Sequence, residues 1–256
     1  MPARSLQARL LPQGPVDALR QVLLIVSGYY AYRLTRGFVD DPSGAVAAFD
    51  HARHLISIEQ ALGIFVEPHI QDFAASIPGL DEICAWVYLN AQTTVTLGAL
   101  VWLYLRHNSS FYFVRNMFMV AWALAIVGYI VYPTAPPRFM PEWGFTDTVA
   151  DFTGVEHDSV AVNALFNPYA AVPSMHVGFA LMVGIPLARL SAVRVTRIVW
   201  MLYPLVVTFV IVATANHFLA DAFLGALTVG AAAWAAAWLG RVRPAAWAFS
   251  QARSAA

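Results

Sequence analysis

The chain has 256 residues, of which 59% are hydrophobic and 12% are charged, and its formal net charge is zero. Soluble globular domains carry about twice that share of charged residues, so the composition excludes an ordinary soluble domain and predicts an integral membrane protein. The sequence contains no lysine. We expect the lipid bilayer as a partner and no nucleic-acid partner, and the sequence makes no prediction about the oligomeric state.

Six segments are apolar and long enough to be membrane spans. They predict a single membrane domain over residues 1–256, folded as an all-α, polytopic six-transmembrane helix bundle. The first span follows several arginines, as the apolar part of a signal peptide does, but no small-x-small cleavage site comes after Tyr32, so we expect a retained helix. The predicted spans are residues 15–36, 83–105, 117–133, 174–187, 198–215 and 218–240.

The arginines are sorted by these spans. Four of them, Arg33, Arg36, Arg53 and Arg138, fall on one side of the six-span arrangement, and the others fall on the opposite side. The positive-inside rule then places both termini in the cytoplasm and the loop between the third and fourth spans on the extracytoplasmic face. We expect a multi-pass protein of the cell (plasma) membrane.

Between the first and second spans, residues 50–73 mix apolar side chains with Arg53, His54, Glu59 and Glu67. This pattern predicts an amphipathic interfacial helix on the outer leaflet, with its acids on the polar face and an interruption at Pro68. Such a helix suits either a packing role or control of lipid access.

The long outer loop, residues 134–173, carries several prolines and acids and is expected to be functional. Its first residues cannot continue the third helix, and they present Arg138 near the bilayer surface. Because the chain lacks lysine, tight binding of an anion must use arginine or backbone N–H groups. We therefore predict that Arg138 binds a phosphoryl group, and a simple anchor to lipid headgroups is the alternative.

Pro173 stops the chain before the fourth span, and Ser174 is a good cap for the helix that follows. Helix N-termini bind anions, so the backbone N–H groups of Ser174 and Met175 are candidate phosphate ligands with His176 beside them. The alternative is an ordinary capped helix with a structural histidine.

His217 and Asp221 lie one helical turn apart at the outer edge of the sixth span, so the carboxylate can fix the tautomer of the ring. Ionisable groups at this depth are costly and usually functional. The pair predicts a nucleophile and its orienting acid. A metal site that adds His176 as a third ligand is the alternative, although no further ligand lies close in sequence to complete it.

These segments together resemble the type 2 phosphatidic acid phosphatase superfamily of membrane lipid phosphatases and phosphotransferases, over most of the chain. The superfamily pattern Pro-Ser-Gly-His is matched by residues 173–176, with Met175 in place of glycine. Its terminal His and Asp, four residues apart, are matched by His217 and Asp221.

The departures from the superfamily pattern resemble those of one branch. Val210 and Ile211 stand where the superfamily has Ser-Arg, and proline precedes Arg138 instead of following it. This pattern is similar to inositol phosphorylceramide synthase, an aureobasidin-resistance type inositol phosphotransferase. Arg33, at the outer end of the first span, is a candidate substitute for the missing arginine, and Asn216 is a further candidate contact.

The resemblance implies a metal-independent enzyme without a cofactor that works through a phosphohistidine. His217 would attack phosphorus while Asp221 holds its other ring nitrogen, and His176 would serve as acid and then as base. Arg138 and the amides of residues 174–176 would clamp the phosphoryl oxygens.

The expected substrate is a phospholipid or a polyprenyl (pyro)phosphate, and the acceptor stays open. Water would make the protein a lipid phosphatase, whereas a hydroxyl would make it a headgroup transferase of the inositol-phosphate type. A non-catalytic transporter or scaffold, with the histidines in a proton relay or structural network, is a third possibility. The apolar interior of most spans argues against a polar path through the membrane.

Overall fold

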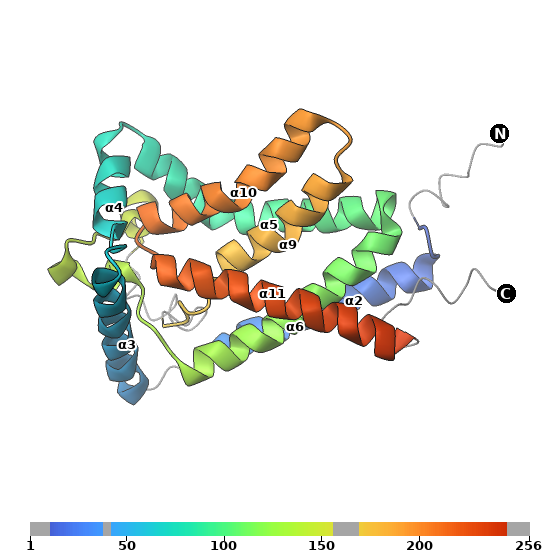
Figure 1. Ribbon diagram of the computed structural model, residues 1–256, viewed down its shortest axis with the longest axis horizontal. Helices are drawn as coiled ribbons and strands as arrows, with labels where there is room; N and C mark the ends of the chain where they lie inside the picture. Colours follow the sequence, from blue (N-terminus) through green and yellow to red (C-terminus); the bar gives the residue numbers. More distant parts are fainter. Residues whose placement is uncertain (1–10, 38–41, 156–168, 245–256) are drawn as a thin grey trace.

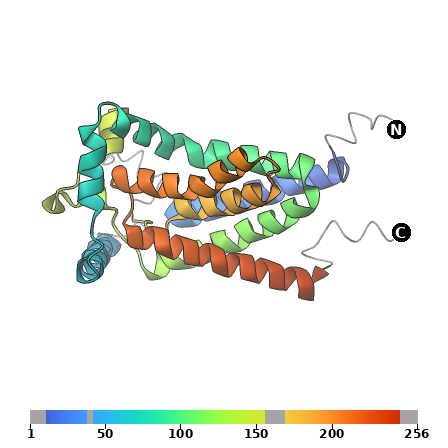
Figure 2. The same cartoon turned by 45° about the horizontal axis from the view of Figure 1, so that its top comes forward.

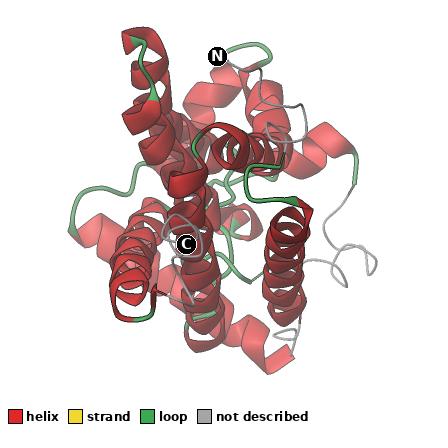
Figure 3. Cartoon of the chain, turned by 90° about the vertical axis from the view of Figure 1, so that its right-hand side faces the viewer, coloured by secondary structure: helices red, strands yellow, loops and turns green. Residues whose placement is uncertain are grey.

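The computed structural model describes residues 11–37, 42–155 and 169–244, and all of its regular elements in these ranges are helices. The helices predicted to span the membrane run roughly side by side (Figure 1), and no strand is drawn in the view along them (Figure 3). This confirms the all-α fold class. The helices are α2 (Pro15–Gly37), α3 (Pro42–Ala61), α4 (Glu67–Ser76), α5 (Leu80–Arg106), α6 (Asn108–Val131), α7 (Thr148–Thr153), α9 (Met175–Leu190), α10 (Arg194–Ala213) and α11 (Leu219–Val242).

Helix α9 is the centre of the bundle, because it packs against α5, α6, α10 and α11. Its Phe179 and Met182 are buried in the main apolar core beside Phe118 and Trp122 of α6. The ring of Phe179 meets that of Phe118 edge-on, with 5.1 Å between the ring centres. The apolar faces that the sequence predicted for separate spans are therefore joined through one central helix.

Among the residues that the structure describes, three helices, α6, α10 and α11, are long and apolar enough to cross a membrane, and α9 is apolar but has only 16 residues. Each of the six predicted spans corresponds to a helix, with shifted ends. Helix α6, for example, begins at Asn108, nine residues before the predicted span. The hydrophobic pattern left these first turns out because they contain several polar residues. An integral membrane protein is therefore supported, and the six-span arrangement remains a prediction.

The segment predicted as one interfacial helix over residues 50–73 is two helices, α3 and α4. The chain turns at Leu62–Val66, and Pro68 stands in the first turn of α4 instead of interrupting a helix, since that position needs no N–H donor. Figure 2 shows both helices across one end of the bundle. The expectation that Glu59 and Glu67 lie on a polar outer face is wrong, because both are buried.

The described part of the outer loop is ordered by contacts with α3 and with its own end. Short 3-10 helices cover Pro137–Phe139 and Pro141–Trp143 before α7. The N–H of Ala135 donates to the carbonyl of Ala48, and that of Thr134 donates to the carbonyl of Tyr169. Residues 156–168 of the predicted loop lie outside the described residues.

Candidate active site

His217 lies in the turn between α10 and α11, and Asp221 lies in the first turn of α11. Nδ1 of His217 lies 3.2 Å from Oδ2 of Asp221, as the four-residue spacing predicted. The same Oδ2 accepts the backbone N–H of Phe218 at 2.9 Å, so a second hydrogen bond holds the carboxylate in position beside the ring. With Nδ1 directed to the carboxylate, Nε2 is the ring nitrogen that does not face Asp221.

The second histidine, His176, lies beside the first. The ring centres of His176 and His217 are 5.6 Å apart, with the planes at 61°. The other side of His176 stacks on Tyr88 of α5 at 4.4 Å. Sequence reasoning missed Tyr88, because a tyrosine in an apolar helix gives no sign of a stacking partner that is 88 residues away.

A close approach of α9 to α11 brings the two histidines together. The N–H of Ser174 donates to the backbone carbonyl of Asp221 at 3.0 Å. A Cβ atom at Gly225 would overlap the carbonyl oxygen of Ser174, so this contact requires glycine. The start of α9 is thereby fixed to the first turns of α11.

Ser174 is the N-cap residue of α9, as predicted. Its side chain makes no capping hydrogen bond, its hydroxyl is buried with no partner in the described part of the chain, and its N–H is already used. Met175 is the first residue of α9 and its side chain is buried in the core. The N–H groups of the first turn after Ser174 lack acceptors within the helix, so they keep the anion-binding direction of a helix N-terminus.

Arg138 is held at the same turn from the loop side. Its backbone N–H donates to the carbonyl of Ala215 at 2.8 Å, and its Nη1 donates to Oδ1 of Asn216. Its Nε lies 3.6 Å from Oδ2 of Asp147, and its guanidinium packs over the ring of Phe139. The structure thus brings Arg138 to the residue that precedes His217.

The side chain of Asn216 contacts Arg138. Its Nδ2 donates to the carbonyl and the hydroxyl of Thr214, which leaves Oδ1 for the guanidinium. Ala215, between Thr214 and Asn216, has a φ of 51°, a left-handed conformation that is uncommon for alanine. Arg33 belongs to α2, and its side chain lies outside the described part of the structure.

The first turn of α11 is covered by acids from α3 and α4. The N–H of Leu219 donates to Glu67 and that of Ala220 to Glu59, each at 2.8 Å. These residues come more than 150 positions earlier in the chain, so no sequence pattern links them to the site. Across the described residues, no group of three His, Cys, Asp or Glu side chains is arranged to hold a metal ion.

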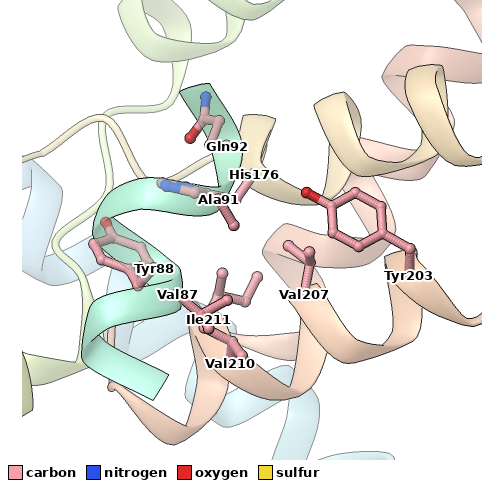
Figure 4. A pocket seen from close by; sticks show the side chains of 9 residues that line it. All are labelled: Val87, Tyr88, Ala91, Gln92, His176, Tyr203, Val207, Val210 and Ile211. Atoms are coloured by element: carbon pink, nitrogen blue, oxygen red, sulfur yellow. The ribbon is translucent and has the colours of Figure 1, made fainter. Parts of the chain in front are cut away.

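A small, mostly apolar pocket adjoins His176 (Figure 4). It lies between α5, α9 and α10, with Gln92 and the hydroxyl of Tyr203 as polar groups near one side. The lining residues are Val87, Tyr88, Ala91, Gln92, His176, Tyr203, Val207, Val210 and Ile211.

A family model described as PAP2 superfamily matches residues 53–235, which is most of the chain and includes every described element of the site. The chain belongs to the PAP2 superfamily. The match begins within α3 and ends within α11. Comparisons with curated proteins and with solved structures gave no match.

Membership of the PAP2 superfamily indicates a lipid enzyme of the phosphatase or phosphotransferase type, and such enzymes generally need no metal. This confirms the superfamily predicted from the two histidine segments. The site geometry is compatible with that chemistry, because a paired histidine, a second histidine and an arginine meet at one turn.

Proposed function

We propose that the protein transfers a phosphoryl group from a phosphorylated lipid through a phosphohistidine on His217. The observation that carries the proposal is the hydrogen bond of His217 to Asp221 with His176 5.6 Å away, in a chain of the PAP2 superfamily. Asp221 keeps the proton on Nδ1, so the lone pair of Nε2 is available for in-line attack on phosphorus.

The reaction has two displacements with the proton carried by His176. In the first, a bond forms between Nε2 of His217 and phosphorus, the bond to the leaving oxygen breaks, and protonated His176 gives that oxygen its proton. In the second, neutral His176 takes a proton from the acceptor hydroxyl, whose oxygen attacks phosphorus. The phosphorus–nitrogen bond then breaks and its electron pair returns to Nε2.

Arg138 would neutralise the phosphoryl oxygens during both displacements. The guanidinium of Arg138 is fixed by Asn216. His217 follows Asn216 in the same turn, so the positive charge and the proposed nucleophile are oriented together. The first-turn amides of α9, at Met175 and His176, would add N–H donors. The pocket beside His176 would take an alkyl part of the lipid substrate or acceptor.

Six helices, α2, α5, α6, α9, α10 and α11, would span the membrane, with α3 and α4 at the extracytoplasmic surface. Figure 1 supports this arrangement, because the start of α2 and the end of α11 lie at the end of the bundle opposite α3 and α4. The site lies at the end with α3 and α4, and most arginines belong to the other end in the proposed topology.

The acceptor decides between two related activities. Water gives a lipid phosphatase, and a polyol or lipid hydroxyl gives a headgroup transferase of the inositol-phosphate type. The apolar side chains beside His176 are compatible with a substrate that has a long apolar part, such as a phospholipid or a polyprenyl (pyro)phosphate.

The test is incubation of the purified protein with labelled lipid phosphates and phospholipids, with and without polyol acceptors. We expect product formation that is lost in His217→Ala and retained in His51→Ala, a control histidine outside the proposed chemistry. Released phosphate identifies a phosphatase, and a new phosphodiester that requires the acceptor identifies a transferase. Equal product from His217→Ala, or no product with any substrate, would contradict the proposal and favour a non-catalytic role.

A further inference from the structure

Two buried acids cap α11 from outside the helix. Oε1 of Glu67 accepts the N–H of Leu219 and Oε1 of Glu59 accepts that of Ala220. Amides in the first turn of a helix have no acceptor within it, so these contacts replace the missing hydrogen bonds. The exposed fractions of Glu59 and Glu67 are 1% and 0%, which makes water an unavailable substitute.

The two acids also contact one another. The carboxyl groups cap consecutive amides of the same turn, so their charges interact, and the Oε2 atom of each is buried with no hydrogen-bond partner in the described part of the chain. Two ionised carboxylates only accept hydrogen bonds and repel each other, so a proton held by one of them stabilises this buried pair. Burial, and then the charge of Glu67, raise the pKa of Glu59 to about 8, which places this proton on the pair at neutral pH.

The charges around the pair do not neutralise it. From α11 the pair faces Asp221, which adds negative charge and is hydrogen-bonded to His217. The loop that packs on α3 carries Arg138 and Asp147. Nε of Arg138 lies 3.6 Å from Oδ2 of Asp147, so these two charges offset each other and not the charge of the acid pair. The exposed titratable groups on the same two helices are Asp50, Arg53, His54, His69 and Asp72.

We propose that Glu59 and Glu67 are positioning residues that share one proton, and that this proton keeps the first turn of α11 in the geometry that Asp221 and His217 need. The acids act through the backbone of Leu219 and Ala220, which directly precede Asp221. Loss of the proton puts two buried negative charges side by side, and their repulsion pulls the carboxylates from the amides. The turn that carries the paired histidine then loosens.

The pair predicts an unusual response to substitution by glutamine. In Glu59→Gln the amide oxygen accepts from Ala220 while the amide N–H donates to Glu67, so the permanent donor replaces the shared proton. Glu67→Gln gives the mirror arrangement. Either substitution should therefore keep the cap and remove its dependence on pH.

The first experiment measures kcat/KM against pH for the proposed phosphoryl transfer. This readout rests on the proposed function. We expect the wild-type rate to fall above about pH 8, and the fall to move up by about one pH unit or more in both single glutamine variants. Glu59→Ala should lose at least about tenfold at every pH, because it removes the acceptor, and Glu142→Gln, at an exposed loop position, should follow the wild type.

The second experiment does not depend on catalysis. Amide hydrogen exchange is measured in the intact protein and read from a peptide that covers residues 217–222. Above about pH 8, exchange of these amides should accelerate in the wild type beyond the intrinsic effect of pH, and it should not do so in Glu59→Gln. Absence of that difference would overturn the proposal whether or not any activity is found. An unchanged alkaline fall in both glutamine variants would overturn it as well, since the fall would then belong to another group such as His176.

A third measurement follows from linkage. The folded protein holds the proton of Glu59 up to about pH 8, whereas the unfolded chain releases it near pH 4.5, so stability decreases as pH rises between these values. The unfolding temperature of Glu59→Gln should therefore depend less on pH in this window than that of the wild type. Equal slopes would contradict the shared proton.

Discussion

Asp221 connects most of the parts of the candidate site. Its side chain accepts from Phe218 and faces His217, while its backbone carbonyl accepts from Ser174 at the start of α9. One residue therefore orients the first histidine and fixes the helix that carries the second. The sequence predicted the first contact from helical spacing, but the second depends on how two helices pack.

Replacing Asp221 with asparagine separates these roles. The backbone contact with Ser174 remains, but the side chain no longer requires a proton on Nδ1 of His217, so the wrong tautomer becomes available. By analogy with other histidines oriented by aspartate, we expect kcat to fall by about 10³–10⁴-fold with little change in KM. Steady-state kinetics would test this, and a variant with nearly full kcat would show that the pair does not orient the nucleophile.

At the scale of elements, hydrophobic pattern predicted where the helices are but not what their polar residues contact. The apolar run of α10 and that of α11 were each placed to within a few residues. The segment of α3 and α4 was misread because Glu59 and Glu67 looked like the polar face of a surface helix. Their partners are backbone N–H groups of α11, which a sequence pattern does not reveal.

The contact of α9 with α11 depends on a glycine. Gly225→Ala places a methyl group against the carbonyl of Ser174, and backbone atoms cannot move aside as a flexible side chain does. We expect a loss of about 1–3 kcal/mol in stability and a larger loss of activity, because the two histidines would separate. Thermal unfolding and kinetics measure the two effects.

Gly230→Ala is the matched control on the same helix. A Cβ atom there meets nothing within 4 Å, so alanine should be neutral or slightly stabilising. Equal behaviour of the two variants would mean that α11 does not approach Ser174 as closely as described.

At the scale of the whole molecule, the polar groups of the proposed chemistry lie at one end of the bundle. Arg138, His176 and His217 meet at the end that α3 and α4 cover, away from the connection between α5 and α6. The sequence predicted this segregation from the order of spans and arginines. It did not predict that α3 and α4 cover this end of the bundle, since that depends on contacts between distant segments.

The proposed orientation predicts different labelling at the two ends. In a Cys84→Ala background, which removes the buried natural thiol, Glu142→Cys should react with an impermeant maleimide in intact cells, and Ser109→Cys should react only after permeabilisation. Both positions are exposed in the structure. The reverse pattern would place the site in the cytoplasm, and equal labelling before permeabilisation would contradict the six-span arrangement.

The division between the turn at Ala213–Asp221 and the pocket beside His176 has a consequence for substitutions. The charged and nucleophilic groups are fixed by backbone hydrogen bonds of that turn, whereas the pocket is walled by side chains of α5 and α10 such as Ala91, Tyr203 and Val207. Substitutions in these walls alter the shape of the pocket without changing the hydrogen bonds that fix the turn. Under the proposed function, single substitutions in these walls would change the preferred lipid, and the groups of the proposed chemistry would stay the same.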